Sequence, residues 1–156
     1  YVVPRREATA CDNILAAGTK SFSPSEILSI AQDLAKALEH MHERGYLHLD
    51  GGIHSIAYCW EHEFAFFNSF RLGRKALSLS LSPAEVPLAS YLAKTPELQL
   101  GKDVDCRTDL YLLGAFLYHL ATLMSPFNDH FFSCDERGRK RLEPIAASSV
   151  SAELPR

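Results

Sequence analysis

The sequence predicts a mainly helical α+β domain in which long helices accompany a small β-ribbon. Apolar residues recur every three or four positions from Ile27 to Met41, which is typical of one face of an amphipathic helix. A second apolar stretch over 108–124 has the length of a helix. Between the two lie short apolar runs separated by turn-forming residues, which favour short strands.

The first helix has clear signals at both of its ends. Ser23 is a plausible N-cap, Pro24 suits the first turn, and Glu26 completes the spacing of a capping box. Gly45 is a plausible stop signal. We therefore predict a helix over 22–43.

The ribbon is predicted from short apolar runs in the middle of the chain. The runs 55–59 and 63–67 flank 60–62, which we predict to be the tip of a hairpin, and a further short run covers 46–48. Strict alternation over 76–82 predicts an extended segment with its leucines on one face. The first three residues, 1–3, also have a strand-like composition.

The second helix is predicted over 108–124, with Asp109 in its first turn, where a carboxylate complements the helix dipole. The two helices are expected to pack together through five buried side chains, namely Leu34, Leu38, Leu112, Phe116 and Leu120.

Composition excludes several function classes. With 156 residues, 47% of them hydrophobic and 22% charged, the chain has enough apolar mass for one compact domain. A net charge of −3 argues against nucleic acid as a partner, and no apolar run is long enough for membrane insertion. The four cysteines include no CxxC pair, so we expect reduced thiols and a cytoplasmic location. The strand-like start at Tyr1 suggests a piece of a longer protein.

Five short motifs occur in an order and at spacings that resemble the C-terminal lobe of eukaryotic protein kinases. The histidine and aspartate of the catalytic loop fall at His48 and Asp50, and the DFG position is occupied by Asn68-Ser69-Phe70. The motifs lie at 48–50, 68–70, 95–97, 109–114 and 125–127. The resemblance implies a kinase-like C-lobe over 1–156 without an N-lobe, and leaves 131–156 as an unmatched basic tail. The basic run 137–141 within it is expected to be a solvated helix face or tail.

The resemblance also implies which residues would carry phosphoryl transfer. In kinases, metal ions are held by the DFG aspartate and a catalytic-loop asparagine, whose positions are here Asn68 and Ser55. A neutral amide and a short hydroxyl are poorer ligands for a hard dication. Gly52 replaces the loop lysine. We therefore expect His48, Asp50, Ser55 and Asn68 to be vestigial, with no metal or other cofactor, and the chain not to be an enzyme.

By contrast, the residues that hold such a lobe together are kept. The resemblance assigns this structural role to Pro96, Glu97, Asp109 and Gly114. Asp109 is expected to accept hydrogen bonds from the backbone around His48 and Leu49. His48 itself is expected to be a core histidine bonded to Asp109 or to a backbone carbonyl.

The expected function is therefore that of a pseudokinase-type interaction, scaffolding or regulatory module in signalling. Its expected partners are proteins, a kinase or another signalling protein among them. The alternating leucines Leu77, Leu79 and Leu81 are candidates for a partner-binding edge or for packing onto the lobe. Two alternatives stay open: an atypical protein phosphotransferase with a separately supplied N-lobe, and a structural piece of a large assembly.

Overall fold

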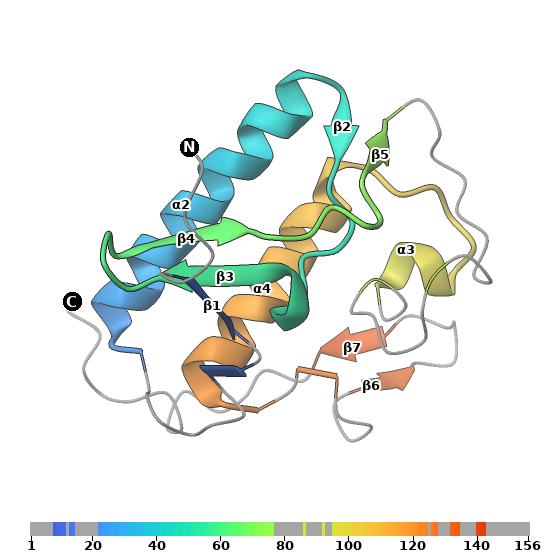
Figure 1. Cartoon of the computed structure of the whole chain (residues 1–156). Helices are drawn as coiled ribbons and strands as arrows, with labels where there is room; N and C mark the ends of the chain where they lie inside the picture. Colours follow the sequence, from blue (N-terminus) through green and yellow to red (C-terminus); the bar gives the residue numbers. More distant parts are fainter. Residues whose placement is uncertain are drawn as a thin grey trace.

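A computed structural model describes residues 8–11, 13–14, 22–76, 86, 92, 95–124, 126–127, 132–134 and 140–142. The elements follow one another as β1 (Ala8–Ala10), α2 (Pro24–Glu43), β2 (Tyr46–Leu47), the 3₁₀ turn η1 (Ile53–Ser55), β3 (Ile56–Cys59), β4 (Phe64–Phe67), β5 (Arg74–Lys75), α3 (Pro96–Gln99), α4 (Cys106–Thr122), β6 (Phe132–Cys134) and β7 (Lys140–Leu142). The described residues thus combine long helices with short antiparallel strands (Figure 1). The predicted α+β class, with long helices and a small β-ribbon, is confirmed.

Helix α2 begins where the capping signal predicts. The Ser23 side chain accepts a hydrogen bond from the backbone of Glu26, and the Glu26 carboxylate in turn accepts from the Ser23 backbone N–H at 2.7 Å. Gly45 follows the helix at a φ of 73°, a left-handed conformation that favours glycine. Both predicted helix signals are confirmed.

Helix α4 is shifted relative to its predicted range. It starts at Cys106, two residues earlier than predicted, because Asp105 and Thr108 form a capping box. It ends at Thr122, because Leu123 adopts a left-handed φ of 58°. The range 108–124 was therefore wrong by two residues at each end, although Asp109 does lie in the first turn.

The strands form small antiparallel sheets. In the three-stranded sheet β3 is central, with β1 on one side and β4 on the other. The β3–β4 hairpin confirms the predicted ribbon, with Ile56 opposite Phe67 and the turn at 60–63. Strand β2 pairs with β5, and β6 pairs with β7. Neither β1 nor β5 was predicted. In the basic run 137–141, Lys140 and Arg141 belong to β7 rather than to a helix.

The core lies where α2, α4 and the hairpin meet. Figure 1 shows the β3–β4 hairpin beside the two helices, and α2 contacts both α4 and β4. One buried cluster joins Leu34, Leu38, Phe116 and Leu120 to the sheet residues. A second cluster surrounds Leu112 and contains Leu47 and Leu49 from the segment after α2. All five side chains predicted to be buried are buried.

Three predicted features lie outside the described residues: the strand at 1–3, the alternating segment 77–82 with Leu77, Leu79 and Leu81, and most of the tail. Among the described cysteines, Cys11, Cys59 and Cys106 carry free thiols. In the part of the chain that the structure describes, no helix has the length and apolarity needed to cross a membrane.

Candidate functional site: a loop held by Asp109

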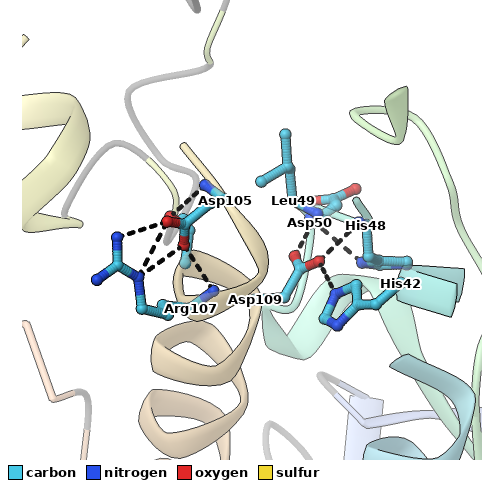
Figure 2. Close-up of polar contacts among 8 residues, drawn as sticks. His42, His48, Leu49, Asp50, Asp105, Arg107 and Asp109 are labelled. Atoms are coloured by element: carbon cyan, nitrogen blue, oxygen red, sulfur yellow. Dashed lines mark hydrogen bonds and ion pairs between the residues drawn. The ribbon is translucent and has the colours of Figure 1, made fainter. Parts of the chain in front are cut away.

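The carboxylate of Asp109 organises the loop that follows β2. It is buried on α4 and accepts hydrogen bonds from the backbone N–H groups of His48, at 2.9 Å, and Leu49, at 2.7 Å. On the α2 side, Nε2 of His42 lies 2.8 Å from Oδ2 of Asp109 (Figure 2). One buried carboxylate therefore ties α2, α4 and the loop together. The predicted contact with the loop backbone is confirmed, whereas the contact with His42 was missed.

Leu49 has an unusual backbone conformation. Its φ is 58°, in the left-handed region that costs a residue other than glycine about 1–2 kcal/mol. Its side chain is buried beside Leu47 and Leu112 in the second core cluster. The hydrogen bond to Asp109 and this burial together hold a conformation that the chain would otherwise avoid.

His48 is held as a neutral imidazole. Its Nε2 lies 2.9 Å from the carbonyl oxygen of Ser69, to which it donates, and its Nδ1 accepts from the backbone N–H of Asp50 at 3.2 Å. The ring also packs against Phe67 and Phe70. Burial lowers the pKa of His48, and this outweighs the opposite effects of Asp109, the Ser69 carbonyl and Asp50. The expectation of a core histidine bonded to a backbone carbonyl is confirmed.

Ser55 is fully engaged within the loop. It ends the turn η1, and its buried hydroxyl donates to the carbonyl oxygens of Asp50 and Gly52. Its own carbonyl accepts a 2.9 Å hydrogen bond from the backbone N–H of Asn68, whose side chain is exposed. Ser55 therefore closes the loop and joins it to the end of β4.

These residues do not fit a magnesium ion at the positions where the resemblance places its ligands. The Ser55 hydroxyl is turned to backbone carbonyls, and Asn68 offers a neutral amide where Mg²⁺ favours anionic oxygen. Within the described residues, no group of three or more histidine, cysteine, aspartate or glutamate side chains could hold a metal ion.

Asp50 lies at the rim of this loop with a cation beside it. Its side chain is 11% exposed, and Oδ1 lies 3.8 Å from a terminal guanidinium nitrogen of Arg71. Arg71 follows the Asn68-Ser69-Phe70 motif directly, and its side chain is 63% exposed. Arg71 was not singled out from the sequence, because an arginine in a turn carries no pattern of its own.

The other residues to which the resemblance assigns a structural role, Pro96, Glu97 and Gly114, lie on α3 and α4. Pro96 starts α3. Glu97 is half-buried, and its Oε2 has no hydrogen-bond partner among the residues that the structure describes. Burial, and secondarily the charge of Glu97, raises the pKa of Tyr111. Gly114 lies on the exposed side of α4, where an added Cβ would meet no atom within 4 Å.

Comparison with known proteins places the chain among relatives of the serine/threonine protein kinases. No protein-family model matches it. A probable serine/threonine-protein kinase of Clostridium perfringens is 33% identical over 110 residues, 70% of this chain and 16% of that protein. A second, from Streptomyces coelicolor, is 28% identical over 144 residues, 90% of this chain and 21% of that protein. Serine/threonine-protein kinase Nek5 of Homo sapiens is 30% identical over 106 residues, 68% of this chain and 15% of that protein.

The chain is thus homologous to serine/threonine protein kinases over most of its length and forms a protein-kinase-like C-lobe. It spans about a fifth or less of the length of these three relatives.

These relatives correct one prediction. The expectation that the chain is not an enzyme is wrong, because the proteins it matches are named as protein kinases. That expectation depended on the residue types at Ser55, Asn68 and Gly52. Substitution at three positions removes particular ligands, but it does not remove the loop geometry, which Asp109 maintains around Asp50.

Proposed function

We propose that this chain is the C-lobe of a protein-kinase-like domain in a signalling protein and contributes Asp50 to phosphoryl transfer onto a protein hydroxyl group. The observation that carries the proposal is the loop geometry. Asp109 fixes the backbone of the two residues before Asp50 by accepting their N–H groups. The Ser55 hydroxyl fixes the Asp50 carbonyl by donating to it. A carboxylate that is partly exposed on such a rigid loop is suited to orienting a substrate hydroxyl.

In the proposed step, the hydroxyl oxygen of the protein substrate attacks the terminal phosphorus of a nucleoside triphosphate. The new O–P bond forms as the bond to the leaving nucleoside diphosphate breaks, and the hydroxyl proton passes to the Asp50 carboxylate. The nucleotide is held with the help of an N-lobe, which the described residues do not include. The names of the relatives support this class of reaction.

The test is phosphate transfer from radiolabelled ATP to a generic protein substrate, with the N-lobe of a relative such as Nek5 added in trans. Transfer should fall at least 100-fold in Asp50→Asn, the usual scale for loss of a general base. Glu61→Gln, an exposed substitution in the hairpin turn, should leave the rate unchanged. Absence of transfer by the parent chain, or equal transfer by Asp50→Asn, would contradict the proposal.

A second candidate function is protein binding for scaffolding or regulation. It is favoured by three large apolar side chains that are half or more exposed: Leu100 at the end of α3, Leu110 on α4 and Leu123 at the end of α4. Such surface favours contact with another protein. The two functions are compatible, since a lobe that presents a catalytic loop also has to dock proteins.

Variants at the surface separate the two candidates. Leu110→Lys should keep the melting temperature and the transfer rate while weakening capture of a protein partner such as a kinase. Leu79→Lys tests the leucine edge in the same way: an unchanged melting temperature with lost capture supports a partner edge, whereas a melting temperature lower by several degrees supports packing onto the lobe. If Leu110→Lys and Leu79→Lys both capture partner normally, the binding function at these surfaces is wrong.

A further inference from the structure

The guanidinium group of Arg71 is the cation beside Asp50. One terminal nitrogen lies 3.8 Å from the Asp50 carboxylate, which is within range of charge attraction but too long for a hydrogen bond. The structure gives Arg71 no hydrogen bond from its side chain to any residue it describes. With 63% of the side chain exposed, the planar fork of donors remains available to a ligand.

A phosphoryl group in transfer requires positive charge close to the proton-accepting carboxylate, because its equatorial oxygens carry the developing charge. The three positions where the resemblance places the loop lysine and the metal ligands supply none: position 52 is glycine, Ser55 is bonded to carbonyls, and Asn68 is neutral. Arg71 brings a permanent cation to this place from the turn after β4. Guanidinium matches phosphate oxygens in a bidentate way that few other side chains can.

The distances are compatible with such a role. A hydroxyl bonded to Asp50 would lie about 3 Å from the carboxylate, and the phosphorus it attacks roughly 3–3.5 Å further on. A guanidinium that starts 3.8 Å from the same carboxylate can reach the oxygens of that phosphoryl group by rotation of its exposed side chain.

We propose that Arg71 binds the phosphoryl group of a nucleoside triphosphate beside Asp50 and supplies the positive charge that Gly52, Ser55 and Asn68 do not. The inference rests on the proposed phosphotransfer function and deepens it by naming the group that holds the phosphate. Before the nucleotide binds, the same guanidinium partly neutralises Asp50.

The test uses inorganic pyrophosphate as the probe, in buffer of low ionic strength without divalent cations. Amide resonances of the intact chain are followed by NMR during the titration. We expect saturable shifts in 48–52 and 68–71. Arg71→Ala and Arg71→Gln should each raise the Kd at least tenfold, and Arg71→Lys should raise it less. Arg107→Ala is the control, because the Arg107 side chain is also exposed, at 82%, but is paired with Asp105. The Kd of this variant should stay within twofold of that of the parent.

Coupling to Asp50 gives a second readout of opposite sign. Asp50→Asn removes a negative charge beside the anion site, so it should lower the Kd for pyrophosphate several-fold. In an Arg71→Gln background the same substitution should have a smaller effect, because the cation it would free is absent. Equal binding by the Arg71 variants and the parent, or shifts confined to residues remote from 48–52 and 68–71, would overturn the inference.

The two proposals fail separately. Arg71-dependent pyrophosphate binding without phosphate transfer would leave the anion site standing and reject the phosphotransferase. Phosphate transfer at an unchanged rate in Arg71→Gln would support the phosphotransferase and reject the role of Arg71.

Discussion

The backbone N–H of Leu49 donates a hydrogen bond of 2.7 Å to Oδ1 of Asp109, which lies sixty positions further along the chain. Because Asp109 is on the first turn of α4, this hydrogen bond anchors the loop that contains Asp50 to the most buried helix of the described fold. The other oxygen of the same carboxylate, Oδ2, accepts a hydrogen bond from the backbone N–H of His48 and lies within hydrogen-bond distance of Nε2 of His42. Any role for Asp50 therefore depends on a residue that never has to touch a substrate.

Replacing Asp109 with asparagine should destabilise the fold by about 2–4 kcal/mol, because buried donors lose a charged acceptor. One amide oxygen cannot accept from both Leu49 and His48 in the present geometry, and the amide N–H₂ would face another donor. Urea denaturation measures the change. Glu39→Gln, on the exposed side of α2, is the control and should shift stability by less than about 0.5 kcal/mol. A similar small shift for both variants would contradict the role of Asp109.

Acid should destabilise the fold through His48. Burial lowers the pKa of His48 below its ordinary value of 6.5, so the unfolded chain binds a proton at a higher pH than the folded chain does. The contribution of His48 is therefore fully present above about pH 6.5 and is lost as the pH falls towards the lowered pKa. The slope is at most about 1.4 kcal/mol per pH unit for one group. Protonation would also break the bond that Nδ1 accepts from the Asp50 N–H.

The measurement is the free energy of unfolding between pH 5 and pH 8 for the parent, His48→Gln and His119→Gln. Burial lowers the pKa of His119 as well, so that residue contributes with the same sign. Around His48 the charged groups are Asp109 and Asp50, both of which favour protonation but are outweighed by burial. His48→Gln should flatten the decline below pH 6.5. A decline of unchanged slope in that variant would show that His48 has the same pKa in the folded and the unfolded chain.

A cavity in the helix interface should cost far more than the same truncation on the surface. Leu34 on α2 is fully buried in the cluster with Phe116 and Leu120, whereas Leu28 on the same helix is 61% exposed. Leu34→Ala should lower the free energy of unfolding by about 2–5 kcal/mol. Leu28→Ala should change it by less than about 0.5 kcal/mol. Comparable losses in the two variants would mean that the α2–α4 interface is not the core.

The hairpin turn contains a residue that glycine would suit better. Glu63 has a φ of 53° directly before β4, while Glu61 in the same turn has no such conformation. Both are exposed. Glu63→Gly should raise the free energy of unfolding by roughly 0.5–1 kcal/mol, because it relieves left-handed strain. Glu61→Gly should lower it slightly, since glycine there only adds freedom to the unfolded chain. Thermal denaturation that ranks Glu61→Gly above Glu63→Gly would contradict this prediction.

Local signals in the sequence were sufficient for α2 and for the β3–β4 hairpin. The Ser23–Glu26 spacing and the period of Ile30, Leu34 and Leu38 both depend on neighbours within one helix. For α4 the predicted start at Thr108 was two residues too late, because the N-cap is Asp105 and the prediction had not used it. The hydrogen bonds from His48 and Leu49 to Asp109 were predictable only through the family resemblance, since the residues lie far apart in sequence.

The contacts that define the candidate site were mostly not predictable. The ion pair of Arg71 with Asp50 and the bond from His42 to Asp109 depend on how separate elements pack, and neither residue belongs to a local pattern. Strands β1 and β5 are two or three residues long, which is too short for alternation to be visible. The left-handed conformation of Leu49 has no sequence signal either, because leucine is an unusual residue to occupy it.

Two glycines, one directly after the 48–50 motif and one at the end of the 109–114 motif, should respond oppositely to an added methyl group. A Cβ at Gly51, next to Asp50, would lie 2.9 Å from Cβ of Leu112 on α4, so the loop or the helix has to move. We expect Gly51→Ala to lower the free energy of unfolding by about 1–3 kcal/mol, the usual cost of overpacking, and to reduce any activity that depends on Asp50. Gly114→Ala meets no atom within 4 Å on an exposed position of the same helix, and alanine favours a helix over glycine by up to about 1 kcal/mol. It should therefore stabilise the chain, as measured by urea denaturation. If Gly114→Ala lowers the free energy of unfolding more than Gly51→Ala does, this prediction is wrong. Gly114 would then have a packing role outside the described residues, and the close approach of Gly51 to α4 would not be what holds the loop.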